Sequence, residues 1–336
     1  MIDRLDTNTK FGVLGYGSWA SAIVGMLNRN SISVNWHIRN AEVLEGLETE
    51  GRNPKYVSEL EFNMDYITLY EDVNEVVKKS DIIIMSIPSA FLKNILEPLH
   101  EDLSNKFIIS AIKGIIPDEY VTVSEFLNMK YNVPFRQMGI LAGPTHAEEV
   151  SRGKLSYLTI ASADTENAVF VGNCLKSKSV HLSYSSDLYG VEYTAILKNI
   201  YALAAGIAAG LGYGDNFIAV LVSACANEMK RFIDESYPYE RNTLTSAYLG
   251  DLLVTCYSNY SRNRRLGQLI GHGCTVKSAL NEMTMIAEGY YASECIRHIN
   301  TVHKIDMPVA DMVHEVLYNN KSPRKAMLAL SGILEK

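Results

Sequence analysis

The sequence lacks the cysteine and histidine patterns that cross-link small secreted proteins or bind zinc. The eight histidines show no HExxH or other paired metal spacing. The five cysteines are odd in number, scattered and without a CxxC pair: Cys174, Cys225, Cys256, Cys274 and Cys295. We therefore expect reduced thiols in a cytoplasmic protein, and neither a disulfide framework nor a metal site.

Positive charge is also in short supply. Lys and Arg total 31 against 38 Asp and Glu, which gives a formal net charge of −7. This balance argues against nucleic acid as the main partner, although a local basic cluster can still bind a small anion. The first ten residues, MIDRLDTNTK, contain no apolar signal region. A length of 336 residues and a hydrophobic content of 47% predict two globular domains.

One long apolar run stands out, from Thr194 to Tyr213. It is long enough to cross a membrane, but it contains Lys198 and Asn199, three glycines interrupt it, and charged residues follow. We therefore predict a buried helix of a soluble domain, with the glycines packed closely against neighbouring helices. A buried ammonium is costly unless it is paired. Lys198 therefore either reaches the surface or lines an internal cleft where it has a task.

A glycine-rich turn follows the first predicted strand, residues 10–15. The sequence Gly15-Tyr16-Gly17-Ser18-Trp19-Ala20 has the form G-x-G-x-x-A, and a helical pattern comes next. In such a turn Gly15 allows the tight bend, Gly17 lets a phosphate approach, and Ala20 lets the helix pack on the strand. Many glycine turns bind nothing, but the N-terminus of the following helix suits a pyrophosphate. The strand–turn–helix setting favours dinucleotide binding.

The end of the second predicted strand, residues 33–38, bears on the choice of cofactor. Arg39 stands there, and the first acid is Glu42. An arginine accommodates the 2′-phosphate of NADP, whereas a carboxylate would bind the ribose hydroxyl of NAD. NADP is therefore favoured and NAD stays open. The alternative is that Arg39 is an ordinary solvated residue.

Short apolar runs alternate with helical patterns as far as residue 189, after which the pattern is helical to the end. We predict an α/β protein with an N-terminal Rossmann-type doubly wound sheet in residues 1–189 and an all-helical C-terminal domain in residues 190–336. The further predicted strands are 67–70, 81–87, 107–112, 139–142, 157–161 and 180–184. Lys113 follows one strand end, where open sheets bind ligands, although an ordinary loop lysine would look the same.

Four further polar positions or stretches are candidate site elements. Thr145, with Glu148 three residues on, matches a capping box, although the same turn could bind a ligand. Asp251 stands beside a glycine in an apolar setting. The run 261–265, SRNRR, places three arginines in four positions, and the arginine fork suits phosphate. A solvated helix accounts for that run about equally well. Glu288, beside a glycine, could meet a cofactor, but nothing in the spacing requires it.

These motifs together resemble the bacterial-type soluble NAD(P)-dependent glycerol-3-phosphate dehydrogenases. The resemblance covers essentially the whole chain, in the blocks GYGSWASA, SAIKG, GPTHAEEVSRG, GVEYTAILKNIYALAAGIAAGLGYGDN, GDLLVTCYSNYSRNRRLG and AEG. It implies reversible reduction of dihydroxyacetone phosphate to sn-glycerol 3-phosphate with NAD(P)H, a supply for phospholipid synthesis. The implied partner is a small phosphorylated substrate. The resemblance implies no stable insertion of the protein in a membrane, and it leaves open whether the protein forms a homodimer.

The resemblance also implies roles for matching residues. Lys198 would transfer the proton, with Lys113 and Asp251 beside it in the catalytic set. Burial and Lys113 should lower the pKa of Lys198, and Asp251 should oppose that shift. The substrate would meet Lys113, Gly143, Thr145, Asp251, Ser261, Arg262 and Asn263. The cofactor would meet Gly15, Gly17, Ser18, Trp19, Arg39, Lys113, Ala147, Arg262, Ile286 and Glu288.

The chain departs from the family pattern at three places. Ile112 replaces the usual threonine of SATKG, and Tyr248 stands where a small residue is usual. Residues 223–226, SACA, replace Thr-Arg-Gly-Leu, so an arginine is missing. These changes leave the implied catalytic residues in place. They bear on cofactor affinity, regulation or helix packing.

Overall fold

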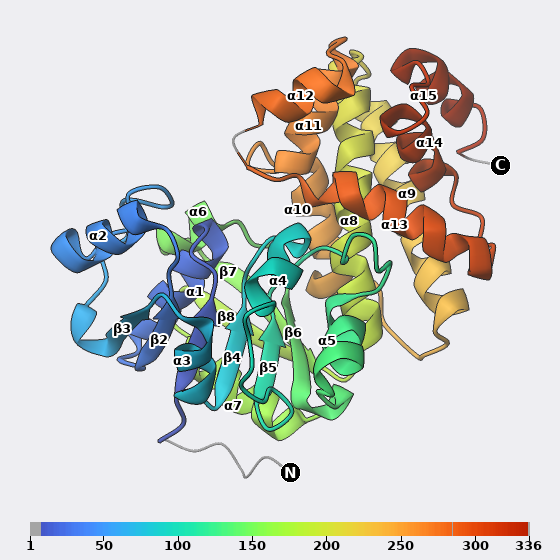
Figure 1. Ribbon diagram of the computed structural model, residues 1–336. Coiled ribbons are helices and arrows are strands. Elements are labelled where there is room, and N and C mark those ends of the chain that lie inside the picture. The colour runs from blue at the N-terminus through green and yellow to red at the C-terminus, as the bar shows by residue number, and fades with distance from the viewer. Residues whose placement is uncertain (1–7, 284, 335–336) are drawn as a thin grey trace. The chain divides into compact units, whose positions relative to one another are not determined.

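The computed structural model describes residues 8–283 and 285–334 (Figure 1). The chain divides into two compact units, here called the sheet unit, Met1–Ile112 with Val123–Leu188, and the helical unit, Lys113–Thr122 with Tyr189–Lys336. The segment Lys113–Thr122 thus joins the helical unit, where Tyr120 stacks on His298 with 3.9 Å between ring centroids. A single domain boundary near residue 189 therefore does not account for the segment Lys113–Thr122.

The sheet unit contains eight strands in the order β3-β2-β1-β4-β5-β6-β7-β8. Strands β1 to β6 are parallel, β7 runs antiparallel to β6, and β8 is parallel to β7. The bounds are β1 (Phe11–Leu14), β2 (Val34–His37), β3 (Ile67–Tyr70), β4 (Ile82–Met85), β5 (Phe107–Ser110), β6 (Met138–Ala142), β7 (Ser156–Ser162) and β8 (Val180–Ser185). Strands β1, β4 and β5 are buried at every residue, as central parallel strands require. The predicted doubly wound sheet is confirmed.

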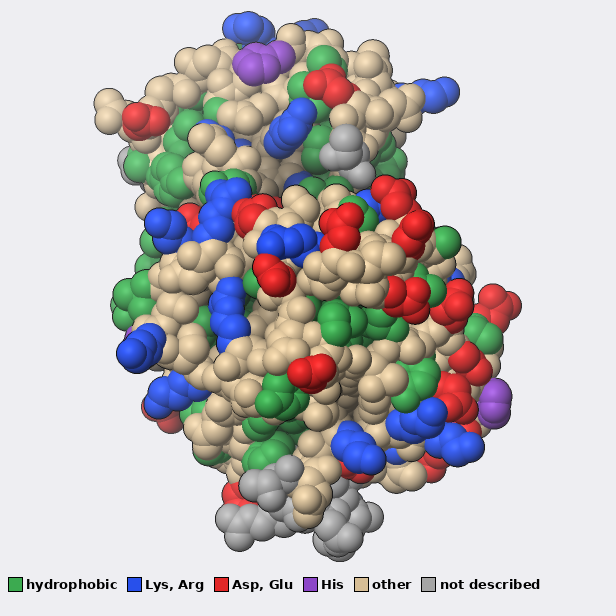
Figure 2. All heavy atoms as spheres, turned by 90° about the vertical axis from the view of Figure 1, so that its left-hand side faces the viewer, with side chains coloured by type: hydrophobic (Ala, Val, Ile, Leu, Met, Phe, Trp, Pro, Cys, Tyr) green, Lys and Arg blue, Asp and Glu red, His purple; other side chains and the backbone are tan. Residues whose placement is uncertain are grey.

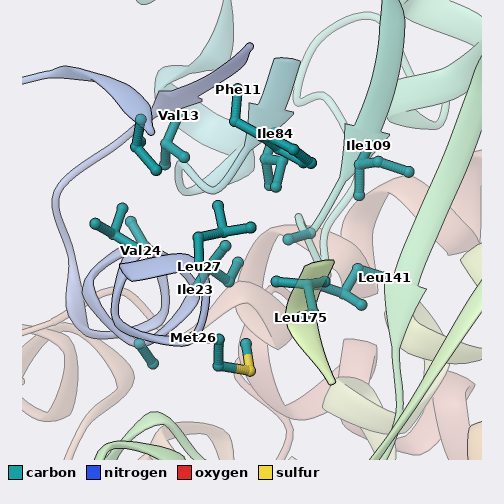
Figure 3. Packing of buried hydrophobic residues seen from close by; sticks show 14 of the residues in the cluster. Phe11, Val13, Ile23, Val24, Met26, Leu27, Ile84, Ile109, Leu141 and Leu175 are labelled. Atoms are coloured by element: carbon teal, nitrogen blue, oxygen red, sulfur yellow. The ribbon is translucent and has the colours of Figure 1, made fainter. Parts of the chain in front are cut away.

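Helices alternate with these strands. They are α1 (Ser18–Arg29), α2 (Ala41–Glu50), α3 (Val73–Lys78), α4 (Ser89–Leu96), α5 (Val123–Tyr131), α6 (Ala147–Ser151) and α7 (Thr165–Leu175), with 3-10 turns at Met64–Tyr66 and Phe135–Gln137. Ile23 and Leu27 of α1 lie among side chains such as Ile84 of β4 and Leu175 of α7 (Figure 3). This packing holds the start of α1 beside the end of β1 and so positions the glycine-rich turn.

The predicted capping box at Thr145 is wrong. Helix α6 begins at Ala147, and its N-cap is His146, which makes no side-chain cap bond. The hydroxyl of Thr145 instead donates to the carbonyl of Gly143 at 3.2 Å. The helix starts one residue later than the box requires, so Glu148 is out of register with Thr145.

After β8, every regular element in the described residues is helical, which confirms the predicted all-helical C-terminal region (Figure 1). The elements are α8 (Leu188–Gly210), α9 (Asp215–Ser236), a π-helical turn (Ser246–Gly250), α10 (Asp251–Tyr257), α11 (Arg262–Gly271), α12 (Val276–Glu282), α13 (Glu288–His303), α14 (Pro308–Leu317) and α15 (Pro323–Ser331). A search of the described residues finds no helix with the length and apolarity to span a membrane.

Helix α8 is the buried centre of the helical unit, with every residue from Gly190 to Ala208 inside. It touches α11 backbone to backbone. A Cβ on Gly206 would lie 2.1 Å from the carbonyl oxygen of Arg264, and one on Gly267 would lie 2.3 Å from that of Leu203. The predicted close packing of glycine in this helix is confirmed at Gly206, and it fixes the start of α11 against α8.

Candidate functional site

Lys198 lies inside the helical unit and does not reach the surface, since its exposed fraction is 3%. Its ammonium donates to the carboxylate of Asp251 and, at 3.0 Å, to the hydroxyl of Thr255. Thr255 stands one helical turn after Asp251 on α10 and donates its own hydrogen to the backbone carbonyl of Asp251 at 2.6 Å. Its oxygen is thereby oriented to accept from Lys198.

Asp251 is fully buried and binds two cations. It opens α10, and its second carboxylate oxygen lies 3.2 Å from the ammonium of Lys113. Its two carboxylate oxygens thus accept from two different lysines. The side chain of Lys113 is 18% exposed, so solvent or a ligand can approach it, whereas Lys198 and Asp251 are buried. A cation in this position suits an anionic ligand.

The electrostatics of the cluster agree with the predicted directions. Burial lowers the pKa of Lys198 from 10.5 to about 7, Asp251 opposes this shift, and Lys113 adds to it. Burial by itself would raise the pKa of Asp251, but the two neighbouring ammonium groups outweigh it and hold that pKa below its ordinary value. Near neutral pH, Lys198 can therefore exchange a proton while Asp251 stays charged.

A chain of asparagine hydrogen bonds ties the site together. Asn199 donates to the backbone carbonyl of Lys113 at 2.6 Å, and Asn263 donates to the side-chain oxygen of Asn199 at 2.9 Å. The oxygen of Asn263 in turn accepts from the backbone N–H of Gly289 at 2.9 Å. These bonds join the segment 113–122, α8, α11 and α13, and so hold Lys113 near Lys198. Ile286 and Glu288 directly precede this junction.

The SRNRR run separates into residues with different surroundings. Ser261 caps α11, since its hydroxyl accepts from the N–H of Arg264 at 3.2 Å. The guanidinium of Arg264 donates to Asn259 at 3.0 Å, and Arg265 is exposed. Arg262, half-buried at the first position of α11, stands between the cap and the buried Asn263. It is the best placed of the three arginines to bind an anion near the start of α11.

The glycine-rich turn lies in the sheet unit between β1 and α1. Gly15 has φ +114°, and a Cβ there would lie 2.2 Å from the carbonyl oxygen of Ser86. A Cβ on Gly17 would meet nothing within 4 Å. The backbone at Gly17 is therefore open to a ligand, while Gly15 is required by the close approach of the end of β4. Ser18 and Trp19 begin α1 beside this opening.

Arg39 is exposed just after β2. The carboxylate of Glu42 is paired with the ammonium of Lys55 at 2.7 Å, so the first acid after the strand is already neutralised. Acidic and basic side chains are interspersed on the face of the molecule that carries α2 (Figure 2). Because Glu42 is paired with Lys55, its carboxylate does not stand as an unpaired negative charge near the 2′-phosphate position predicted at Arg39.

The remaining predicted residues belong to the sheet unit: Gly143 and Thr145 lie between β6 and α6, and Ala147 is the first residue of α6. Gly143 has φ +123°, and its Cβ would be 2.6 Å from the carbonyl oxygen of Tyr157. Thr145 and Ala147 are buried. Within the helical unit, by contrast, the structure brings together Lys113, Lys198 and Asp251 directly.

Two residues of the cluster were missed from the sequence. Asn199 was visible as a second polar residue beside Lys198 in an apolar helix, and Thr255 follows Asp251 by one helical turn. The four-residue spacing of Asp251 and Thr255 places both on one face of a helix, and a polar side chain such as Asn199 in a buried helix needs a hydrogen-bond partner. These signals identify a partner only once the positions of α8 and α10 are known.

Comparison with known proteins gives consistent matches. The models of the NAD-dependent glycerol-3-phosphate dehydrogenase N-terminus and C-terminus match residues 10–168 and 187–328. A glycerol-3-phosphate dehydrogenase, NAD(P)+, of Thermoanaerobacter sp. (strain X514) is 33% identical over 322 residues, 96% of each chain. One from Salinibacter ruber is 34% identical, covering 95% of this chain and 94% of that protein.

Solved structures give the same fold. The glycerol-3-phosphate dehydrogenase of Coxiella burnetii superposes with a TM-score of 0.88 at 26% identity, covering 98% of this chain and 99% of that one. A D-mandelate dehydrogenase reaches a TM-score of 0.60 at 14% identity, over 95% of this chain and all of that one, which is a likeness of fold alone.

Proposed function

The chain belongs to the NAD-dependent glycerol-3-phosphate dehydrogenase family, and from this premise we propose that it reduces dihydroxyacetone phosphate reversibly to sn-glycerol 3-phosphate with NAD(P)H. The observation that carries the proposal is the buried Lys198, whose pKa is lowered to about 7 and whose ammonium is bound by Asp251. A lysine of this kind can give or take a proton at neutral pH.

In the proposed reaction Lys198 acts on the ketone oxygen. An ammonium has three N–H donors, and Asp251 and Thr255 each accept from this one. The third can donate to the ketone and pass its proton to the oxygen as the alkoxide forms. When bound, the nicotinamide supplies the hydride. In the reverse direction Lys198, as the neutral amine, accepts the hydroxyl proton.

The phosphate of the substrate would be bound by cations of the helical unit. Arg262 offers a planar fork of donors at the start of α11, and the partly exposed ammonium of Lys113 attracts the anion. Asn263 gives one amide hydrogen to Asn199, which leaves it a second for the substrate. Binding energy from the phosphate would position the reacting carbon.

The glycine-rich turn is the proposed pyrophosphate site. Gly17 leaves its backbone accessible, and Ser18 and Trp19 begin the adjoining helix, which suits a dinucleotide. Arg39 would bind a 2′-phosphate, so NADP is favoured over NAD. In this proposal the sheet unit binds the dinucleotide, and the helical unit, which includes Lys113, binds the substrate. Contacts of the cofactor with Ala147, Ile286 and Glu288 stay predictions.

The test of the function is a substrate comparison with the purified protein. Oxidation of NADPH and of NADH is followed with dihydroxyacetone phosphate, unphosphorylated dihydroxyacetone and a 2-keto acid. The proposal expects fast turnover of the phosphorylated ketone alone, and a lower KM for NADPH than for NADH that is lost in Arg39→Ala. Preference for the 2-keto acid would indicate a hydroxy-acid dehydrogenase, and no turnover of any would indicate a dinucleotide-binding protein without this activity.

The physiological part of the proposal is a supply of glycerol phosphate for phospholipid synthesis in the cytoplasm. All five cysteines are free, as a reducing compartment would keep them. Cells that lack the chain should then need supplied glycerol phosphate to make phospholipids. If such cells made phospholipids normally without the supplement, and had no other source of glycerol phosphate, this role would be contradicted.

A further inference from the structure

Both carbonyl groups at the start of the glycine-rich turn are bound by buried side chains from elsewhere in the sheet unit. Trp36, on β2, donates its indole N–H to the carbonyl of Gly15 at 2.7 Å. Asn53, beyond the end of α2, donates its amide to the carbonyl of Tyr16 at 2.8 Å. Both side chains have an exposed fraction of 0%. Neither residue belongs to the G-x-G-x-x-A sequence.

These two bonds determine which way the peptide groups of the turn point. In a trans peptide the C=O and the following N–H point in opposite directions. Holding the carbonyl of Gly15 therefore directs the N–H of Tyr16, and holding the carbonyl of Tyr16 directs the N–H of Gly17. Glycine backbones rotate readily, and a rotated peptide would turn a carbonyl oxygen toward an anion that needs N–H donors.

Asn53 is engaged at every polar atom, so its orientation is fixed. Its amide nitrogen also donates to the hydroxyl of Ser21 in α1 at 3.0 Å, and its oxygen accepts from the N–H of Lys55 at 3.1 Å and of Tyr56 at 3.3 Å. Lys55 in turn pairs with Glu42, close to Arg39 in the sequence. One asparagine thus connects the turn, the first helix and the segment that neutralises Glu42.

Trp36 has a packing role that can be separated from its hydrogen bond. Its ring meets Phe62 edge to face, with 5.3 Å between centroids. A phenylalanine at position 36 would keep an aromatic ring in the core but remove the indole N–H together with part of the ring's volume. The loss of packing is therefore measured separately, in a variant of Phe62 that keeps the indole N–H.

We propose that Trp36 and Asn53 are positioning residues that lock the glycine-rich turn in the orientation that binds the pyrophosphate of a nicotinamide dinucleotide. The inference rests on the proposed function, because it presupposes that the turn binds this cofactor. Neither side chain need touch the cofactor. Each acts through a backbone carbonyl whose peptide group carries a ligand-facing N–H.

The test compares Trp36→Phe and Asn53→Ala with two matched controls. Phe62→Leu disturbs the same aromatic pair without removing an N–H. Asn28→Ala removes another mostly buried asparagine of the sheet unit, which bonds both backbone groups of Asn63 at 2.8 and 2.9 Å. For each protein the Kd of NADPH and NADH is measured by nicotinamide fluorescence, with the Tm, and with kcat and the KM of dihydroxyacetone phosphate at saturating cofactor.

The inference expects Trp36→Phe and Asn53→Ala to raise the dinucleotide Kd roughly five- to thirtyfold, the worth of one lost hydrogen bond. The kcat at saturating cofactor and the KM of the ketone should stay close to wild type. The controls should lower the Tm to a similar degree and leave the Kd unchanged. Trp36→Phe and Asn53→Ala are made in separate proteins, so if one of them does not fold, the other still tests the inference.

Two results would overturn the inference in distinguishable ways. Wild-type Kd values in both variants, or equal weakening in the controls, would assign Trp36 and Asn53 a structural role only and leave the proposed function intact. Failure of the wild-type protein itself to bind NADPH or NADH would overturn the proposed function and, with it, this inference.

Discussion

Replacing Asp251 with asparagine tests the electrostatics of the site most sharply. The change keeps the side-chain shape but removes the carboxylate that binds both Lys113 and Lys198. Lys198 would lose the neighbour that raises its pKa while keeping burial and Lys113, both of which lower it. We therefore expect its pKa to fall below the wild-type value of about 7.

The size of the effect can be estimated from Coulomb's law. Two unit charges 4 Å apart at an effective dielectric of about 20 interact by about 4 kcal/mol, which corresponds to about three pKa units. The expected downward shift is therefore about two to three units. Breaking a buried ion pair also destabilises a fold by about 3–5 kcal/mol, so the variant's folding must be checked by circular dichroism.

Lys198 makes the stability of the folded protein depend on pH. Its pKa is lowered from 10.5 in the unfolded chain to about 7 in the fold. Between these values the unfolded state binds more protons, so this group makes wild-type stability rise with pH through that window. In Asp251→Asn the window should begin at a lower pH. As pH rises toward 7, Lys198 of the variant should already lose its proton, so part of the variant's loss in free energy of unfolding should be recovered by neutral pH.

The assay is the pH profile of kcat for reduction of dihydroxyacetone phosphate. In the wild type kcat should decline as pH rises through about 7, where Lys198 loses its proton. In Asp251→Asn the decline should come at lower pH. Glu228→Gln is the matched control, since Glu228 is equally buried in the helical unit but accepts from the N–H groups of Val309 and Ala310. An unshifted decline in a folded Asp251→Asn would refute the reasoning.

Three further predictions concern binding and stability. Arg262→Ala should raise the KM of dihydroxyacetone phosphate by about ten- to a hundredfold through the loss of a charged hydrogen bond, and an unchanged KM would remove it from the phosphate site. Gly206→Ala should lower the free energy of unfolding by about 1–3 kcal/mol, because its Cβ would lie 2.1 Å from the carbonyl oxygen of Arg264. Gly332→Ala should change little, because its Cβ would lie 3.5 Å from the carbonyl oxygen of Ala329, an ordinary contact. Burial raises the pKa of Glu228 from 4.5 to about 7, so the folded state binds more protons in that window and wild-type stability falls as pH rises through it. Chemical denaturation should therefore show the stability difference between wild type and Glu228→Gln changing by about 3 kcal/mol across the window, and a constant difference would contradict the burial effect.

Much of the fold could be predicted because its signals are local. Continuous apolar runs such as 81–87 indicate strands buried on both faces, and strand β4 (Ile82–Met85) lies within that run. The burial of the helix around Lys198 could be predicted from its long apolar run, but whether Lys198 itself reaches the surface could not. The direction of its pKa shift then followed from burial and a nearby cation.

What could not be predicted depends on contacts between distant segments. The capping box at Thr145 failed because its hydroxyl binds the carbonyl of Gly143, an alternative that the spacing to Glu148 does not reveal. The asparagine bonds that link Lys113 to Gly289 join residues far apart in the chain. Hydrogen-bond partners of this kind can be identified only when the positions of the helices relative to one another within the helical unit are known.

The most direct test of the central claim is the turnover of Lys198→Met. Methionine is about as long as lysine and uncharged, and Asp251 keeps Lys113 as its partner, so the variant should fold. The account predicts that kcat for reduction of dihydroxyacetone phosphate falls by at least about a hundredfold, the usual contribution of a general acid. The Kd of NADPH should stay near wild type. Near-normal turnover in this variant would contradict the assignment of Lys198 as the proton donor.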